Sequence, residues 1–375
     1  MAGIYLHIPF CKKACHYCDF HFSTSSLYKN DMIAAISKEI LLQKNFLNNI
    51  PIETIYFGGG TPSLLTADEL KILIDLIHEN YPVAQNPEIT LEANPDDLNP
   101  QTVKELKHTL INRFSIGIQS FFEEDLVWMN RAHNSKEAES AVKRVQDAGF
   151  ENITVDLIYG YPLLSKEKWI SNMSKVIDFS VPHVSAYSMT VEPSTALASF
   201  ISKSKQPVMD EAQSAGHFLM LMQTLQEEGF EHYEISNFAK PGKYSRHNSN
   251  YWNGVPYLGV GPSAHSFKDH IRQWNVANNT RYINSITAGQ IPFEKEFLSD
   301  ANRVNEYIMT SLRTAKGMDL EKIKSEFNPD FLTTIACEVQ TFTDKEWIKQ
   351  TKQVFTLTTE GKLYADHIAS ELFVE

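Results

Sequence analysis

Cys11-Lys-Lys-Ala-Cys15-His-Tyr-Cys18 is the stretch that decides the fold, because it holds three of the four cysteines of this chain. The fourth, Cys337, lies far away in the sequence. Such a loop is too short for a disulfide framework, but it lets three thiolates bind one inorganic centre. A 4Fe-4S cluster takes four ligands, so three thiolates leave one iron open. The spacing therefore predicts a 4Fe-4S cluster on Cys11, Cys15 and Cys18, with chemistry or tight cofactor binding at the open iron.

The cysteine loop has two other interpretations. One is a structural zinc ion whose fourth ligand is an imidazole, since His7, His16 and His21 lie nearby in the sequence. The other is three unrelated buried thiols. Structural zinc usually takes paired Cys-x-x-Cys knuckles, so the spacing and the sequence that follows favour the cluster.

Composition indicates an ordinary globular protein. The chain has 375 residues, 42% of them hydrophobic, and a net charge of -12 from 34 basic and 46 acidic side chains. No block of Lys and Arg is present, which argues against nucleic acid or a membrane surface as a partner. No apolar run is long enough to insert into a membrane, and residues 1–10 lack the features of a signal peptide. We expect a cytoplasmic protein with reduced cysteines.

Six short runs rich in β-branched and aromatic residues alternate with segments of helical period. Repeated strand-helix units require parallel strands with right-handed crossovers. The pattern predicts an α/β fold built on an incomplete (β/α)6 barrel, and a doubly wound open sheet is the alternative. The predicted strands lie at residues 4–8, 54–57, 89–92, 114–118, 153–158 and 183–189.

Polar groups follow five successive strands of this predicted barrel. They are the cysteine loop, the glycines 58–60, Glu92, Gln119 and the segment 156–159. Each has an ordinary explanation as a tight turn, a loop residue or a paired core acid. In a barrel, however, the carboxyl ends of the strands build one mouth, so we expect these groups to form a single site.

The sequence changes character after the sixth strand. We predict a partial barrel over residues 1–230, a connecting segment over residues 231–299 and a C-terminal module over residues 300–375. The connecting segment is rich in Tyr, Asn, Gly, Pro and His, which is typical of long functional loops. The order of helices and strands in the module resembles a winged helix. Its excess of acidic side chains argues against the usual DNA-binding role of that fold.

Local motifs carry a resemblance to the radical S-adenosylmethionine (SAM) superfamily. The cysteine loop followed by Gly58-Gly-Gly-Thr-Pro62 is similar to the signature of that superfamily. Within it the whole chain resembles the branch that contains oxygen-independent coproporphyrinogen III dehydrogenase, and most of all the HemW-type heme chaperones. The motifs that agree are Tyr5-Leu-His-Ile-Pro-Phe-Cys11, Glu92-Ala-Asn-Pro95, Gly117-Ile-Gln-Ser-Phe121, Asn130-Arg-Ala-His133, Asp156-Leu-Ile-Tyr-Gly160, Ser185-Ala-Tyr-Ser188 and His247-Asn-Ser-Asn-Tyr-Trp252.

The resemblance implies a binding site for SAM, whose amino and carboxylate groups chelate the open iron in this superfamily. Gly59, Gly60 and Thr61 would approach its amino end, because glycine lacks a Cβ. Glu92 and Arg131 would supply charged contacts to its amino and carboxylate groups.

Four further residues take roles in SAM binding by the same resemblance. Gln119 and Asp156 would bind polar edges and the ribose hydroxyls. Tyr17 would contact the adenine, and Tyr5 would line the pocket.

Heme is the second ligand that the resemblance implies, with His247 of the HNxxYW motif as the expected axial ligand. Tyr251 and Trp252 can supply flat apolar contacts to a porphyrin. A loop packed by its aromatic side chains is the ordinary explanation of this motif. Arg246 can instead serve a heme propionate, and His265 and His133 are alternative ligands.

The expected function is a heme chaperone that transfers heme to an acceptor protein, which the sequence does not identify. Oxidative decarboxylation of coproporphyrinogen III is the alternative, and radical SAM modification of nucleic acid is disfavoured by the acidic charge. Two departures argue against the decarboxylase. Phe20 stands where those enzymes carry a fourth cysteine, and only ten residues precede Cys11 where they have a longer extension. A third departure is Tyr161-Pro-Leu-Leu-Ser165, where the family more often has leucine, proline and glycine followed by glutamine. The resemblance therefore does not predict the contacts of that loop.

Overall fold

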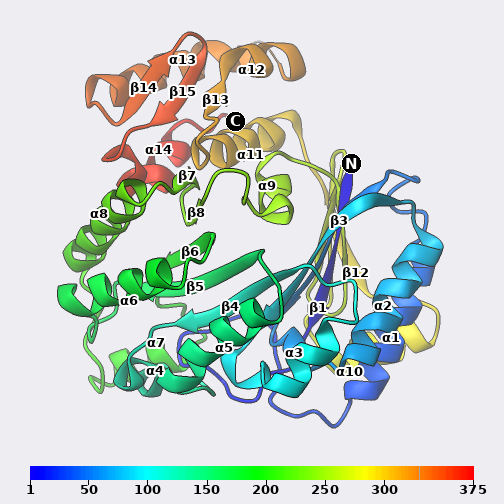
Figure 1. Cartoon of the computed structure of the whole chain (residues 1–375). Helices are drawn as coiled ribbons and strands as arrows, with labels where there is room; N and C mark the ends of the chain where they lie inside the picture. Colours follow the sequence, from blue (N-terminus) through cyan, green and yellow to red (C-terminus); the bar gives the residue numbers. More distant parts are fainter. Residues whose placement is uncertain (329) are drawn as a thin grey trace.

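The computed structural model describes residues 1–328 and 330–375. Figure 1 shows a large body built on a curved sheet and a smaller C-terminal module set against one end of it. In the described part of the chain, no helix combines the length and the apolar character needed to cross a membrane.

Six parallel strands form the centre of the large body, as the sequence predicts. They are β1 (Ala2–Ile8), β2 (Ile52–Gly59), β3 (Val83–Ala93), β4 (Arg113–Gln119), β5 (Ile153–Tyr159) and β6 (His183–Ser188), and they lie side by side in chain order. The connections carry α1 (Lys29–Leu42), α2 (Ala67–Asn80), α3 (Pro100–Leu106), α4 (Glu123–Trp128), α5 (Ser135–Asp147) and α6 (Lys166–Asp178). The helices cover the outer face of the sheet (Figure 1).

The sheet does not close, so the barrel is partial. Its order is β12-β11-β10-β9-β1-β2-β3-β4-β5-β6-β8-β7, which leaves β12 and β7 as edges. Strand β9 (Tyr257–Val260) pairs with β1 in parallel, whereas β10 (His265–Lys268), β11 (Ile271–Asn275) and β12 (Phe293–Phe297) are antiparallel. At the other edge, β8 (Asn237–Ala239) and β7 (Glu231–Glu234) follow α7 (Ala196–Ser202) and α8 (Glu211–Glu227).

The expectation of long loops after residue 230 is wrong. That segment contains β7 to β12, together with α9 (Arg246–Trp252) and α10 (Asn279–Thr287), and extends the sheet at both edges. Each of these strands has three to five residues. So short a run shows too little alternation to be distinguished from a loop in the sequence.

The two faces of β1 have different chemistry. Ile4, Leu6 and Ile8 are fully buried in the hydrophobic core that the sheet shares with the helices. Tyr5 and His7 alternate with them, so they point to the opposite, inner face. The inner face of the partial barrel is therefore where polar groups gather.

The C-terminal module has its own core and its own sheet. Strands β13 (Met318–Asp319), β15 (Val354–Leu357) and β14 (Ile348–Thr351) pair in that order and pack with α11 (Asp300–Leu312), α12 (Leu320–Glu326), α13 (Asp330–Asp344) and α14 (Ala365–Glu371). Ile235 packs against both this core and the core of the large body. Its backbone N–H donates to the carbonyl of Arg313 at 2.9 Å, which joins the module to the edge of the large sheet.

Glu39 of α1 holds the extra strands in place from inside the core. This carboxylate is fully buried, and its donors come from α1, the loop after β9, β11 and α10. They are the Gln43 amide at 2.9 Å, the Gly261 N–H at 2.8 Å, the Asn275 amide at 2.7 Å and the Tyr282 hydroxyl. Burial raises the pKa of Glu39, and these hydrogen bonds act against that rise.

We expect Glu39→Ala to destabilise the chain by about 3–5 kcal/mol, because it leaves several buried donors without an acceptor. Glu79→Ala, at an exposed position of α2, is the control and should change stability by less than about 0.5 kcal/mol. Urea unfolding of both variants measures the difference. Equal midpoints would show that the Glu39 network does not stabilise this edge.

Candidate functional site

The cysteine loop begins where β1 ends at Ile8, and backbone hydrogen bonds fix its path. The N–H of Cys11 donates to the carbonyl of Ser23 at 3.0 Å, and that of Cys18 donates to the carbonyl of Cys15 at 3.3 Å. His16 anchors the centre of the loop, because its N–H reaches the carbonyl of Met129 at 3.1 Å. All three cysteines are half-buried, whereas Cys337 is exposed on α13.

Two side chains donate hydrogen bonds to the thiol sulfurs. The hydroxyl of Thr61 lies 3.4 Å from Sγ of Cys11, and Nη1 of Arg131 lies 3.3 Å from Sγ of Cys15. Burial raises the pKa of Cys11, and burial with the charges of the other two thiolates raises that of Cys18 to about 12. Three thiols on one loop, with hydrogen bonds directed at the sulfurs of Cys11 and Cys15, fit an iron-sulfur cluster.

Each imidazole that the zinc alternative could use has a hydrogen-bond partner on at least one of its two ring nitrogens. Nε2 of His7 lies 2.8 Å from the carbonyl of His21, and Nε2 of His21 lies 2.7 Å from the amide oxygen of Asn279. Nδ1 of His16 lies 2.8 Å from the carbonyl of Trp128.

Arg131 connects the cysteine loop to two strands. Its Nη2 donates to Oδ1 of Asn94 at 2.7 Å and to the carbonyl of Gly117 at 2.8 Å. Asn94 in turn donates from Nδ2 to the hydroxyl of Thr61 at 3.3 Å. Asn94 is a residue that the sequence analysis did not assign to the site, although the Glu-Ala-Asn-Pro motif that contains it was the available signal.

The glycine run after β2 brings backbone against the start of the cysteine loop. Gly59 has φ of 107°, a conformation that favours glycine. A Cβ on Gly60 would lie 2.7 Å from the carbonyl oxygen of Phe10 and 2.9 Å from that of Ile8. Only glycine permits this approach, so this turn forms one wall of the site next to Cys11.

Two carboxyl groups lie on the inner face of the barrel. The Tyr56 hydroxyl donates to Glu92 at 2.8 Å, and Ser115 donates to Asp156 at 3.1 Å. Burial raises the pKa of Glu92 to about 7 and that of Asp156 to about 6, and the charge of Asp156 adds to the effect on Glu92. Neither has a basic partner at ion-pair distance among the described residues, so the interior attracts a cationic group.

The remaining predicted SAM residues surround these groups. Gln119 ends β4 with φ of 65°, which is uncommon outside glycine and is typical of functional sites. Its amide lies next to Gly117 and Arg131. Tyr17 interacts with the charge of Arg131, and Tyr5 stacks on Tyr56 with ring centroids 6.1 Å apart.

His247 adjoins this group next to Tyr5 and Tyr56, and it lies in helix α9 rather than in a loop. It is 2% exposed, and both of its ring nitrogens have partners. Nδ1 lies 2.7 Å from the Thr54 hydroxyl and Nε2 lies 2.9 Å from the Tyr251 hydroxyl. The ring also stacks on Tyr56 with centroids 4.8 Å apart.

Two protein families match parts of the chain. Residues 5–175 match the radical SAM superfamily, and residues 298–364 match the HemN C-terminal domain. The heme chaperone HemW of Bacillus subtilis is 30% identical over 371 residues, with 98% of each protein covered. HemW of Lactococcus lactis is 31% identical, with 95% of this chain and 93% of that protein covered.

This chain belongs to the HemW heme chaperone family. The family's Escherichia coli member is 34% identical over 70% of this chain and 69% of its own length. Among solved structures, the radical SAM enzyme coproporphyrinogen III oxidase (HemN) from Escherichia coli superposes with a TM-score of 0.86. That match covers 100% of this chain and 90% of the enzyme at 19% identity, so the HemW-family chain shares the enzyme's fold.

The raised pKa of Glu92 predicts a pH dependence of stability. The folded chain binds this proton more tightly than the unfolded chain, so stability falls as pH rises from about 4.5 to about 7. At pH 8 the loss from this group is about 3 kcal/mol. Glu92→Gln should remove it, so the variant should lose less stability than the wild type between pH 5 and pH 8.

Chemical unfolding of the cluster-free protein at both pH values measures this difference. The variant Glu79→Gln, at an exposed position, is the control and should follow the wild type. A wild type and a Glu92→Gln variant with the same pH dependence would mean that Glu92 titrates normally.

Proposed function

We propose that this chain is a heme chaperone that carries a 4Fe-4S cluster with SAM on its open iron and transfers heme to an acceptor protein. Its membership of the HemW family supports the proposal. The observation that carries it is the position of the HNxxYW helix. Tyr251 and Trp252 of α9 line a cleft of about 1110 Å³, which also receives Asp19 and Phe20 from the end of the cysteine loop. A heme-sized cavity therefore adjoins the cluster site.

In the proposed cluster site, Cys11, Cys15 and Cys18 would each bind one iron, and the cluster would supply one-electron chemistry. Arg131, held by Asn94 and Gly117, would bind the SAM carboxylate. Glu92 would bind a positively charged group of SAM in its ionised form.

The other proposed SAM contacts follow the same chemistry. The backbone of Gly59 and Gly60 and the hydroxyl of Thr61 border the amino end of SAM. Tyr5, Tyr17, Gln119 and Asp156 border the remainder. What supports this assignment is their common location around Arg131 and Glu92.

We infer a winged-helix-like form for the module that begins near residue 300. The order α11, α12, α13 and the hairpin β14–β15 supports it, as does a core that the module forms from residues 304–374. The module is more acidic than basic, so a protein acceptor suits it better than nucleic acid.

We expect Cys11→Ala to abolish the iron-sulfur absorption after anaerobic reconstitution, because one of three thiolate ligands is lost. Cys337→Ala is the matched control and should keep the absorption, since that thiol is exposed on α13. Iron and sulfide analysis with visible spectroscopy measures both. Stoichiometric zinc without iron or sulfide would contradict the cluster.

Parallel assays of the reconstituted protein separate the chaperone from the decarboxylase. Heme titration should give a saturable Soret band, and bound heme should pass to an apo-hemoprotein acceptor. Coproporphyrinogen III supplied with SAM and a reductant should remain unchanged. Turnover of coproporphyrinogen without heme binding would support the decarboxylase instead.

A further inference from the structure

We propose that His265 of β10 is the axial ligand of heme iron, and that the cleft between the barrel and the C-terminal module is the heme site. This inference rests on the proposed heme chaperone function and goes further by assigning the ligand and the site. The residues from the barrel that line the cleft include Tyr5, His7, Phe20, Tyr257 and His265. Those from the module include Arg303, Tyr307, Lys316, Lys322 and Phe327.

His265 has the properties that an iron ligand needs. Its side chain is exposed in the cleft, and neither ring nitrogen has a hydrogen-bond partner among the residues that the structure describes. Its ring stacks on Trp274 with centroids 5.9 Å apart, which holds its orientation. Partial burial in the cleft lowers the pKa of His265, with the charge of Arg272 acting in the same direction and that of Glu296 against it. The neutral imidazole is the form that binds iron.

The other imidazoles near the cleft have hydrogen-bond partners. His7 uses both ring nitrogens, with the Tyr5 hydroxyl at 3.3 Å and the carbonyl of His21 at 2.8 Å. His21 has a partner on Nε2, the amide oxygen of Asn279 at 2.7 Å, so it has one ring nitrogen fewer to offer than His265. His247 does not line the cleft, and iron ligation would cost it the bond to Thr54 or to Tyr251.

His247 has a different role in this arrangement, as a positioning residue. Its Nε2 holds the hydroxyl of Tyr251, whose ring lines the cleft and packs edge-on against Tyr257 with centroids 4.5 Å apart. In the HNxxYW motif, Tyr251 thus lines the proposed heme site, and His247 contacts Tyr251 from the side away from the cleft. The histidine of the motif orients an aromatic side chain and leaves ligation to His265.

Aromatic side chains from both sides of the cleft suit a flat apolar ligand. Phe20, directly after the cluster loop, is 68% exposed although large apolar side chains are usually buried. Trp252 lies on α9, Phe267 on β10 and Tyr307 on α11, and all three line the same cleft. Together they provide faces on which a porphyrin can stack.

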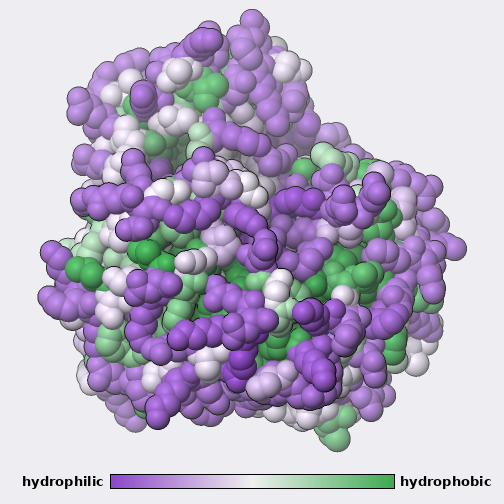
Figure 2. All heavy atoms as spheres, viewed as in Figure 1, coloured by the Kyte–Doolittle hydropathy of each residue, from purple (hydrophilic) through white to green (hydrophobic). Residues whose placement is uncertain are grey.

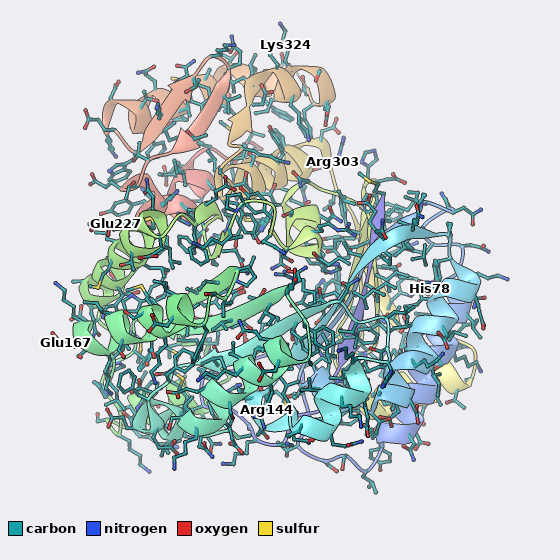
Figure 3. All side chains as sticks on the ribbon, viewed as in Figure 1. His78, Arg144, Glu167, Glu227, Arg303 and Lys324 are labelled. Atoms are coloured by element: carbon teal, nitrogen blue, oxygen red, sulfur yellow. The ribbon has the colours of Figure 1, made fainter. Side chains whose placement is uncertain are left out.

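Basic side chains on the module side suit the two propionates of heme. Lys316 is exposed, and its ammonium donates to the amide oxygen of Asn253 at 2.9 Å without an acidic partner among the described residues. Arg303 projects from α11 where the module faces the barrel (Figure 3), but its Nη1 is paired with Asp300 at 3.0 Å. Arg272 is already paired with Glu296 at 2.9 Å and with Glu306, so it is less available.

Acidic side chains line both sides of the cleft. Asp19 and Asp269 come from the barrel, and Glu306, Asp319 and Glu326 come from the module. Glu326 lies 3.8 Å from Lys322. Lys316 is therefore the cation best placed to receive a carboxylate. Figure 2 shows apolar residues open to solvent on the barrel body, with hydrophilic side chains around them.

The test is heme titration of His265→Ala, with the cluster content and melting temperature of each variant checked first. We expect loss of the wild-type Soret and visible bands and at least tenfold weaker binding. Added imidazole should restore the wild-type bands by entering the vacated position. His78→Ala is the control, because His78 is an exposed imidazole on α2, outside the cleft (Figure 3).

A second pair of variants tests the rest of the site. Lys316→Glu should weaken heme binding severalfold while the bands of the bound heme keep their positions. Lys324→Glu, on the same module but outside the cleft lining, is its control and should bind as the wild type does. His247→Ala should weaken binding through Tyr251 and still show the wild-type bands at saturation.

The outcomes separate this inference from the proposed function. A wild type that binds no heme overturns the chaperone function itself. A wild type that binds heme beside a His265→Ala variant with unchanged bands and affinity overturns only the assignment of His265. Loss of the bands in His247→Ala but not in His265→Ala would make His247 the ligand.

Discussion

The guanidinium of Arg131 is the group on which the arrangement of the cluster site depends. It bonds to Cys15 in the cluster loop, to Asn94 after β3 and to the backbone of β4 at Gly117. Through Asn94 it reaches Thr61, which bonds to Cys11. One planar group with several donors in fixed directions can do this, and a lysine with a single ammonium cannot. The hydrogen bonds of Arg131 thus hold the cysteine loop, the residue after β3 and strand β4 together in one site.

The inner face of the barrel carries two carboxyl groups. Glu92 and Asp156 lie on the inner face without a basic partner at ion-pair distance among the described residues, and burial raises both of their pKa values. Their charged forms cost free energy in the absence of a cation. A ligand with a positive group removes that cost on binding. These two carboxyl groups therefore lower the stability of the free chain, and a cationic ligand bound between them would remove that cost.

The sheet extension beyond β1 borders the cleft that the barrel forms with the C-terminal module. Strands β9 to β12 continue the sheet beyond β1, and Glu39 fixes them from the helix behind. His265 and Phe267 lie on β10 of this extension, and α9 packs against β1 and β2. The module faces them with α11 and the segment around Lys316. The open barrel thus leaves an edge along which the cleft that we propose as the heme site is formed.

Local spacing and period in the sequence were enough to predict the repeated parallel units and the partial barrel, and to group Cys11, Cys15 and Cys18 as candidate ligands of one centre. The sequence placed Glu92, Gln119 and Asp156 near strand ends because parallel strands align their carboxyl ends. Other features became visible in the tertiary structure alone. Asn94 joins Arg131 to Thr61, and short strands replace the expected loops. The His247 side chain is buried, whereas that of His265 is exposed. These features depend on pairings between residues far apart in the chain, and neither the period nor the composition of a single segment specifies such pairings.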